Sequence, residues 1–237
     1  TVFQHYPMQP ILKIITESGK QVTCTYNQPF LTETGWVRAD ELDIKTKIRV
    51  ASKIPNNVTT FSPTEFSKIE TKTNNHKKTK IPQEFTPKLA SLCGYLLGDG
   101  HVHASGYKTA AYVSEEEMDL MPMITSMFEN LFDVKTNVYT RNKNSISTID
   151  DGSGLLRKIV RKQQLNIIEV DSKQVNQCLS FLRRKRVPQA IFKSPKQVVA
   201  KFISWLFDAD GCAFGNGRWR TSVQLKSKKP NLRRDVQ

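Results

Sequence analysis

Two aspartates at the ends of two similar apolar stretches are the residues of this sequence best suited to carry chemistry. Residues 92–100 read Leu-Cys-Gly-Tyr-Leu-Leu-Gly-Asp-Gly, and residues 203–211 read Ile-Ser-Trp-Leu-Phe-Asp-Ala-Asp-Gly. Asp99 and Asp210 therefore occupy equivalent positions, and each precedes a glycine. If the two stretches pack side by side, their carboxylates meet, and like charges that close stay ionised only with a cation between them. Because hard carboxylate oxygens favour Mg²⁺ or Mn²⁺ over zinc, the pattern predicts a divalent-metal site.

The elements that position these aspartates are predicted to be helices. Each apolar stretch follows a proline, Pro87 in the first copy and Pro195 in the second, and each stops at a glycine. This punctuation predicts two helices of roughly 12 to 15 residues. The helix dipole disfavours a carboxylate on the last turn by roughly 0.3–1 kcal/mol, so the two acids need a reason to be there. The bland alternative is a pair of buried helices whose Asp-Gly ends are incidental.

The paired stretches resemble the signature helices of the LAGLIDADG homing endonucleases. The resemblance implies that the two helices form the interface between pseudo-symmetric halves of a monomer, with an α+β fold of αββαββα order in each half. It also implies that the last aspartate of each helix binds Mg²⁺ and helps to hydrolyse one strand of double-stranded DNA. Gly94 and Gly98 match the close-packing positions of this interface, as does Ala209, whereas Trp205 stands where a glycine is usual.

Lys185 is the next catalytic candidate. Lys185-Arg186-Val187-Pro188 matches the Lys-x-Ile/Val-Pro segment of the same family, and the resemblance implies that this lysine approaches the active-site water and the scissile phosphate. Taken alone, a lysine within a run of four basic residues is equally a phosphate contact or a solvated charge. His101 and His103 alternate just past Asp99, but such a pair is more often one buried and one exposed histidine than a metal site.

Composition favours a polyanionic partner. The chain of 237 residues has a formal net charge of +14, and because residues 1–52 are close to neutral, nearly all of that excess lies in residues 53–237. Such a balance suits a polyanion, and together with the two motifs it favours nucleic acid, which the resemblance implies is double-stranded DNA. No apolar run approaches the roughly 18 residues that span a bilayer, so we expect no membrane association. The four cysteines show no C-x-x-C pair, which indicates reduced thiols in the cytoplasm or an organelle interior.

The N-terminal segment predicts a separate β module. Residues 10–50 alternate β-branched residues with close turns, and residues 19–39 resemble one block of the Hint domain that performs protein splicing in inteins. In that block a Thr and a His help to activate the first peptide bond; Thr25 matches the Thr, whereas Gln28 replaces the His and cannot exchange a proton near neutral pH. With Thr1 first and Gln237 last, we expect a fragment that does not splice. The alternative is an unrelated β module.

The remaining boundaries follow from composition and periodicity. We expect a partial Hint segment at 1–52, a basic linker at 53–84 with one short helix near 64–69, a first half-domain at 85–194 and a truncated second half at 195–237. The first half is predicted to contain strands at 101–103 and 107–114, a helix at 115–132, a strand pair at 135–139 and 145–150, and helices at 154–164 and 172–183. The second half is predicted to add strands at 212–214 and 219–225.

The predicted strands of the two halves form the DNA-reading surface that the resemblance implies. Six outward basic residues on them are expected to bind phosphate or read guanine edges: Lys108, Lys135, Arg141, Lys143, Arg218 and Arg220. We therefore expect an intein-borne, site-specific DNA endonuclease. Two alternatives stay open, namely a DNA- or RNA-binding module that keeps the fold without cleaving and a longer intein that still splices.

Overall fold

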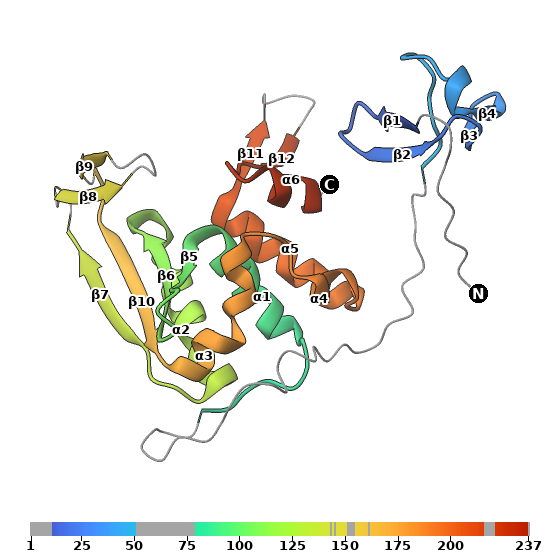
Figure 1. Cartoon of the computed structure of the whole chain (residues 1–237). Coiled ribbons are helices and arrows are strands. Elements are labelled where there is room, and N and C mark those ends of the chain that lie inside the picture. Colours follow the sequence, from blue (N-terminus) through green and yellow to red (C-terminus); the bar gives the residue numbers. More distant parts are fainter. Residues whose placement is uncertain are drawn as a thin grey trace. The chain divides into compact units, whose positions relative to one another are not determined.

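The described chain forms two units, a small one of β-hairpins and a larger one that mixes helices and strands (Figure 1). The computed structural model of the 237-residue chain describes residues 11–50, 79–142, 144, 146–150, 155–160, 162–215 and 221–236. Of these, residues 79–233 belong to the larger unit, and residues 11–50 with 234–236 belong to the smaller one. Because helices accompany sheets whose strands pair antiparallel, the predicted α+β class is confirmed.

Two antiparallel hairpins in the smaller unit confirm the strands expected between residues 10 and 50. They pair β1 (Ile11–Ile15) with β2 (Gln21–Thr25) and β3 (Pro29–Thr32) with β4 (Gly35–Arg38), and a 3₁₀ turn, η1 (Ala39–Glu41), follows. Within residues 11–50 only Thr32 and Ala39 are buried, while Trp36 is 71% exposed. The described part of this unit therefore has almost no apolar core, and isolated hairpins of this size are marginally stable.

A four-stranded antiparallel sheet of order β5-β6-β10-β7 forms the base of the larger unit. The strands are β5 (Gly100–Val102), β6 (Lys108–Ser114), β7 (Asn137–Arg141) and β10 (Leu165–Asp171). Ile168 in the central strand pairs with Ala111 on one side and with Val138 on the other. Ala111 and Ile168 are fully buried, because their face of the sheet packs against α1 (Pro87–Asp99) and α2 (Leu120–Phe132).

Two long helices, α1 and α5 (Lys196–Asp210), confirm the helices expected around the aspartates. The Thr86 side chain caps α1 by accepting from the backbone N–H of Leu89, and Pro87 occupies the first turn. α5 begins after Pro195 without a side-chain cap. The shorter helical elements of this unit are η3 (Glu115–Glu117), α3 (Lys173–Cys178), η4 (Ser180–Arg184) and α4 (Gln189–Phe192), and α6 (Pro230–Val236) ends the described chain.

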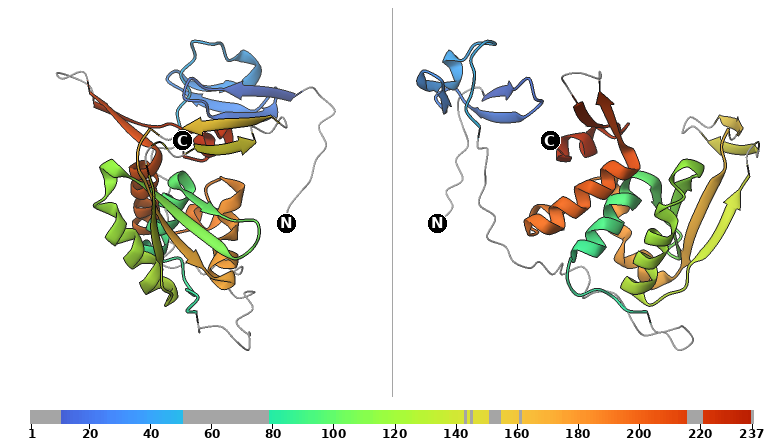
Figure 2. Two further views of the ribbon diagram at one scale, coloured as in Figure 1. Left: turned by 90° about the vertical axis from the view of Figure 1, so that its left-hand side faces the viewer. Right: turned by 180° about the vertical axis from the view of Figure 1, so that it is seen from behind.

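The helix predicted at residues 154–164 is wrong. In its place stands β9 (Leu156–Val160), which pairs antiparallel with β8 (Ile146–Asp150), and β10 begins five residues later. The predicted pairing of the strands near 135–139 and 145–150 is also wrong, because β7 pairs with β10 instead. The apolar doublets at 155–156 and 159–160 have helical spacing, but they belong to a hairpin that extends beyond the main sheet (Figure 2).

The helix predicted at 115–132 begins later than expected. Residues 115–117 form the 3₁₀ turn η3, and the α-helix starts at Leu120. The Ser114 hydroxyl donates to the Glu117 carboxylate at 2.8 Å and does not cap the backbone. Met118, which precedes α2, is 46% exposed, whereas Ile124 and Phe128 within α2 are fully buried.

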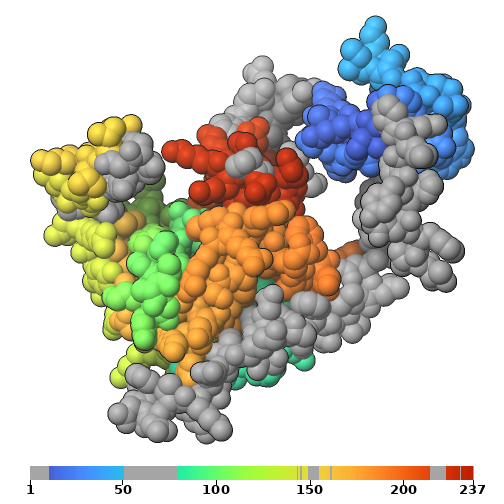
Figure 3. Space-filling view, viewed as in Figure 1, coloured from blue at the N-terminus to red at the C-terminus, as the bar shows by residue number. Residues whose placement is uncertain are grey.

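Segments distant in sequence lie side by side on the surface of the larger unit. Residues of β6 contact β10 and α3, and β5 contacts η4, so the green and orange surfaces adjoin in Figure 3. β11 (Gly211–Gly215) and β12 (Thr221–Leu225) pair antiparallel after α5, as predicted for the second half. Within the described residues, no helix combines the length and the hydropathy that a membrane span requires. The expected helix near 64–69 lies outside the described residues.

Candidate active site

The contact between α1 and α5 depends on two glycines of α1. A methyl group at Gly94 would overlap the backbone carbonyl oxygen of Phe202 and lie 3.0 Å from the backbone nitrogen of Leu206. A methyl group at Gly98 would lie 2.6 Å from the Cβ atom of Ala209. A methyl group at either position would therefore lie closer to α5 than van der Waals contact allows, so only glycine lets the helices approach this closely. The side-by-side packing expected from the sequence is confirmed, and Figure 1 shows the two helices together.

Trp205 lies in this interface despite its size. It is only 7% exposed, and its ring meets the ring of Tyr95 edge-on, with centroids 6.1 Å apart and planes at 77°. The Tyr95 hydroxyl in turn donates to the backbone oxygen of Tyr112 at 2.8 Å. The tryptophan is therefore accommodated beside α1 and anchors it toward the sheet, while the glycines keep the backbones close.

The two aspartates end their helices beside one another. Asp99 is the last residue of α1 and Asp210 the last of α5. The carboxyl carbon of Asp210 lies 3.3 Å from the position of a Cβ atom on Gly98, the residue next to Asp99. Gly100 and Gly211 follow directly and begin strands, and only glycine fits there, because a methyl group at either would overlap the last turn of the preceding helix. The predicted meeting of the two acids is thus present in the fold.

The pKa shifts in the site are those of two partly buried carboxylates. Burial, followed by the nearby Asp210 and Glu117 carboxylates, raises the pKa of Asp99 to about 6, against the opposing charge of Lys185. Burial also raises the pKa of Asp210, and Lys185 again opposes the rise. Glu117 was not predicted as a site residue, because it stands in a run of glutamates and nothing in the sequence indicates that this run lies near Asp99. A bound cation would offset the repulsion that Asp210 and Glu117 exert on the Asp99 carboxylate.

Lys185 belongs to this site through the end of α1. Its Nζ donates to the backbone oxygens of Leu96, Leu97 and Gly100, at 3.4, 3.1 and 2.9 Å. Its backbone is left-handed, with φ of 49°, and ends η4. Burial lowers the pKa of Lys185, although Asp210 and Asp99 oppose this change. The lysine therefore places a positive charge at the negative end of the α1 dipole, where the charges of Asp99 and Asp210 also act on it.

The donor set fits a hard divalent cation rather than a zinc site. Within the described part of the chain, no cluster of three or more His, Cys, Asp or Glu residues has metal-binding geometry. The site instead offers two carboxylates, and Mg²⁺ commonly binds through one or two carboxylates while the rest of its shell comes from water and phosphate. Asp99 and Asp210 are thus suited to Mg²⁺ or Mn²⁺ by their chemistry.

The histidines near Asp99 show the ordinary arrangement. His101 is exposed and His103 is half-buried, and their rings meet edge-on with centroids 4.3 Å apart and planes at 86°. The backbone of His103 pairs with Lys108 and accepts from Asn176, so this residue is fixed by the turn between β5 and β6. Partial burial and the positive neighbours His103, Lys185 and Arg183 lower the pKa of His101.

The predicted DNA-binding residues fall into three groups. Lys108, at the start of β6, is engaged by acids: its Nζ donates to Glu169 at 2.7 Å and lies 3.6 Å from an oxygen of Asp171. Lys135, in the loop before β7, and Arg141, at the end of β7, are exposed. Lys143, Arg218 and Arg220 lie outside the described residues. The two acids were missed from the sequence, because only the strand β10 brings them opposite Lys108.

Thr25, the last residue of β2, and Gln28, directly before β3, are the residues that match the splicing block. The Thr25 hydroxyl donates to the side-chain oxygen of Asn27 at 2.8 Å, and the backbone N–H of Gln28 donates to the backbone oxygen of Thr25 at 3.2 Å. The Gln28 amide donates to the backbone oxygen of Pro29 at 3.3 Å. Both side chains therefore bond within their own turn.

Comparisons with known proteins give partial similarities. No protein-family model matches the chain. It is 26% identical over 208 residues to the replicative DNA helicase DnaB of Nostoc sp., covering 86% of this chain and 20% of the helicase. It is 25% identical over 210 residues to transcription initiation factor IIB of Methanocaldococcus jannaschii, covering 86% of this chain and 24% of that factor. Over 132 residues it is 24% identical to glutamine–fructose-6-phosphate aminotransferase of the same archaeon, covering 56% and 11%. The chain thus spans a quarter or less of each relative, and these similarities assign no family.

Proposed function

We propose that this chain belongs to an intein-borne homing endonuclease of the LAGLIDADG type, which hydrolyses phosphodiester bonds at a specific site in double-stranded DNA. The observation that carries the proposal is the contact of α1 and α5, which brings Asp99 and Asp210 together beside Lys185. Two equivalent helices with equivalent terminal acids suit a reaction on two equivalent strands. The family resemblance and the glycine-dependent packing support the same reading independently of charge.

The partial similarities to unrelated proteins support the mobile character of the chain. A helicase and a transcription initiation factor have different activities by name, yet each is similar to 86% of this chain over a quarter or less of its own length. The resemblance therefore follows a segment within these proteins rather than either named activity. A segment carried by proteins of unrelated activity is what an intein provides. Two features are consistent with a splicing module joined to a basic nuclease. They are the segment 19–39, which resembles a Hint block, and the near-neutral charge of the smaller unit with its two hairpins.

The roles of the site residues follow from their chemistry. Asp99 and Asp210 would hold Mg²⁺ or Mn²⁺, which stabilises negative charge on a phosphate and makes bound water more acidic. Between reactions, the ammonium of Lys185 partly offsets the charge of the two acids and holds the end of α1 in place. Gly94 and Gly98 set the distance between the helices, and hence between the acids. The +14 charge of the chain attracts the DNA backbone.

A non-cleaving nucleic-acid-binding module is the second candidate, and one observation favours it. The three N–H groups of the Lys185 ammonium match three backbone oxygens of α1 and the residue after it. A lysine committed in this way stabilises the helix end and has no donor left for a phosphate. This arrangement suits a protein that keeps the paired helices for stability and binding alone.

A cleavage assay separates the two candidates. The 237-residue chain is incubated with Mg²⁺ or Mn²⁺ and a library of supercoiled plasmids that carry fragments of the source genome and the uninterrupted host gene. We expect linear product from the native chain and a loss of at least about a hundredfold in Asp99→Asn and in Asp210→Asn, because each removes a metal ligand. Asp208→Asn removes an exposed carboxylate from α5, the helix that also carries Asp210, and serves as the matched control. Binding without cleavage by the native chain would support the non-cleaving module. Equal cleavage by the native chain and the Asp99 variant would instead show that Asp99 is not a metal ligand of the reaction.

A further inference from the structure

Two segments in equivalent places of the two halves of the larger unit carry opposite charges. β6 ends 15 residues after Asp99, and β12 ends 15 residues after Asp210. The residues that follow β6 are Glu-Glu-Glu at 115–117, the glutamate segment, and those that follow β12 are Lys-Ser-Lys-Lys at 226–229, the lysine segment. The two equivalent aspartates are therefore accompanied by segments of opposite charge.

The glutamate segment adds negative charge to the acids of the site. After burial and the charge of Asp210, the Glu117 carboxylate is the next cause that raises the pKa of Asp99. After burial, the same carboxylate raises the pKa of Asp208 in α5. The Ser114 hydroxyl donates to Glu117 and holds it in this place. A DNA phosphate that approached the glutamate segment would be repelled.

The lysine segment is held at the end of α5. The backbone N–H of Lys226 donates to the backbone oxygen of Asp210 at 3.1 Å, and the backbone N–H of Lys229 donates to the Ser227 hydroxyl oxygen at 3.2 Å. Leu232, three residues further on, is only 1% exposed. The segment is thus fixed on one side by the backbone of a site acid and on the other by a buried side chain, as the course of the chain from β12 to α6 shows (Figure 1).

The charge of the lysine segment acts on the site. Burial is the main cause that lowers the pKa of Lys185, and the charges of Asp210 and Asp99 oppose it. The positive charge of Lys229 lowers this pKa further. Two ammonium groups from different parts of the chain are therefore close enough to repel each other beside the two acids. An anion that binds next to them offsets this repulsion.

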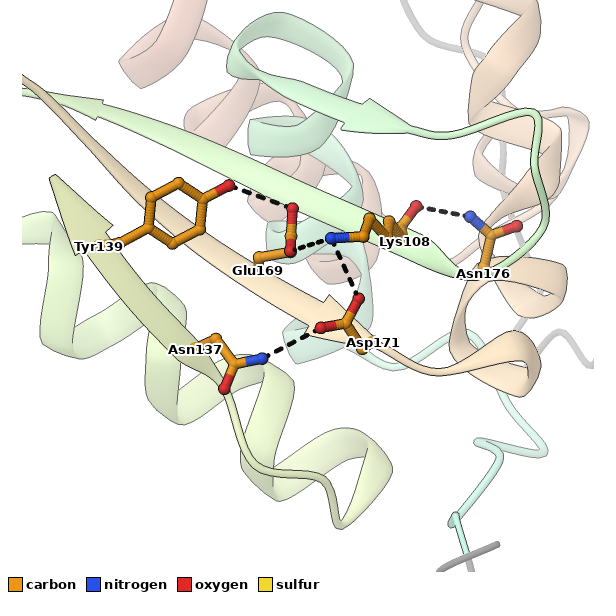
Figure 4. A network of polar contacts seen from close by, with 6 residues as sticks. All are labelled: Lys108, Asn137, Tyr139, Glu169, Asp171 and Asn176. Atoms are coloured by element: carbon orange, nitrogen blue, oxygen red, sulfur yellow. Dashed lines mark hydrogen bonds and ion pairs between the residues drawn. The ribbon is translucent and has the colours of Figure 1, made fainter. Parts of the chain in front are cut away.

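Lys108 shows the opposite situation (Figure 4). Its ammonium contacts Glu169 and Asp171 of β10, at 2.7 and 3.6 Å, so its charge is offset within the protein. Among the ion pairs of the described residues, none involves Lys228 or Lys229, and both residues are exposed. The charge of the lysine segment is therefore available to an anion from outside the chain.

We propose that the lysine segment binds a backbone phosphate of one DNA strand next to the cleavage position, so that the chain cuts this strand first. The inference rests on the DNA-cleaving function proposed above, which brings a phosphate of each strand to Asp99 and Asp210. One strand gains a charged contact from the lysine segment, whereas the other meets the glutamate segment in the equivalent place. The two hydrolyses are the same reaction, and they differ in how firmly the phosphate is positioned.

Cleavage measured separately on each strand tests the order of cutting. The native chain is incubated in Mg²⁺ with a duplex that contains the plasmid site found in the cleavage assay and carries a different fluorophore on each strand. We expect one strand to be cut about tenfold faster, because one charged hydrogen bond to a phosphate changes a rate by about that factor. Lys228→Met combined with Lys229→Met should slow the faster strand about tenfold and leave the slower strand within about twofold.

The matched control removes two lysines from the opposite ends of the two helices. Lys88, in the first turn of α1, and Lys193, just before α5, are both exposed. Lys88→Met combined with Lys193→Met removes the same charge as the lysine-segment variant and should leave both strand rates unchanged. Thermal unfolding of the two double variants reports whether each keeps the native fold.

The salt dependence of binding tests the phosphate contact without cleavage. Affinity for the same duplex is measured in EDTA at several salt concentrations; if no plasmid is cut, a duplex of mixed sequence takes its place. We expect the slope of the logarithm of affinity against that of salt concentration to decrease by at least about 0.9 in the lysine-segment variant, because a phosphate contact is lost. The control variant should keep the native slope, and so would a lysine segment with a merely structural role.

The outcomes separate this inference from the function on which it rests. Equal rates on the two strands in the native chain, or a rate difference that the lysine-segment variant keeps, would overturn the order of cutting and leave the proposed function standing. An unchanged salt slope in that variant would overturn the phosphate contact. If the native chain cuts no plasmid, the proposed function fails and the order of cutting with it, while the salt slope still decides whether the lysine segment binds phosphate.

Discussion

The helices α1 and α5 are two versions of one element, and their differences show which parts of it are needed for the shared site. A proline begins α1 and directly precedes α5, and both helices end at an aspartate whose following glycine begins a strand. They differ in burial, because α1 is buried without interruption from Leu89 to Leu97 whereas α5 buries only Val198, Phe202, Trp205 and Leu206. The features that the two helices share lie at the contact between α1 and α5 and at the terminal acids.

The ends of the two helices are also satisfied differently. Three backbone oxygens at the end of α1 accept from the Lys185 ammonium, whereas the backbone oxygen of Asp210 in α5 accepts from the backbone N–H of Lys226 at 3.1 Å. One end therefore has a side-chain cation and the other a backbone partner. The equivalence of the two acids in sequence does not extend to their surroundings, so the two halves of the site are expected to respond differently to substitution.

Gly94→Ala should produce the largest loss of stability. The added methyl group meets the backbone of Phe202 and Leu206 in α5, which cannot rotate away, so the helices must separate. We expect the free energy of unfolding to fall by about 3 kcal/mol, even though alanine favours a helix by about 1 kcal/mol over glycine. Chemical denaturation measures this change. An unchanged denaturation midpoint would mean that α1 and α5 pack less tightly than their geometry indicates.

Lys185→Met should cost less and should affect the α1 end alone. The methionine keeps most of the apolar stem, while three charged hydrogen bonds to the helix end are lost. We expect a loss of about 2 kcal/mol in the free energy of unfolding. Lys193→Met changes an exposed lysine on a neighbouring element and should stay within about 0.5 kcal/mol of the native chain. Equal effects of the two substitutions would remove Lys185 from its capping role.

Gly98→Ala should cost about 1–2 kcal/mol, and a second change should restore the loss. Here the added methyl group meets the Cβ atom of Ala209, 2.6 Å away, rather than backbone. Ala209→Gly removes that atom, so the double variant transfers one methyl group from α5 to α1. We expect the double variant to recover most of the stability in a double-mutant cycle of denaturation measurements. Additive losses would show that the two positions do not face each other.

The smallest predicted effect concerns pH. Because the pKa of Asp99 is raised to about 6 from 3.8, the folded chain binds this proton more tightly than the unfolded chain does. The stability from this proton is fully present below about pH 4 and is lost as the pH rises through 6. In EDTA, Asp99→Asn should thus exceed the native chain by about 1 kcal/mol at pH 8, a figure reduced for partial exposure, and match it at pH 4.

Asp133→Asn, which removes an exposed acid, provides the control for this pH measurement. It should leave the decline of stability between pH 4 and pH 8 as it is in the native chain. If Asp99→Asn shows the same decline as the native chain, Asp99 is not the group that titrates. Denaturation at both pH values with each variant distinguishes these cases.

The parts of the fold that the sequence predicted are those with local punctuation. Pro87 and Gly100 bound α1, Pro195 and Gly211 bound α5, and the structure follows them. The hairpin β8–β9 was predicted in part as a helix, because apolar doublets four residues apart suit both structures. Pairing partners decide between them, and a pairing of Ile146 with Val160 is a long-range fact that no local window contains.

The candidate site was predictable in its residues and not in its contacts. Asp99, Asp210 and Lys185 are brought together as expected. The three-carbonyl contact of Lys185 depends on a left-handed backbone after η4, which nothing in Arg-Arg-Lys-Arg indicates. Likewise, the pairing of Lys108 with acids 61 and 63 positions away required the strand β10, whose place in the sheet was not predicted.

Gly100 and Gly211 give the molecule a property beyond close packing. Each joins a helix to a strand without an intervening loop, so the carboxylate and the sheet behind it move as one rigid piece. Under the proposed function, no hinge separates the sheet that binds a DNA groove from the acid that takes part in cleavage. Such a protein cannot shift its cut by a base pair while keeping its grip. Its cutting position is a fixed offset from its recognition sequence.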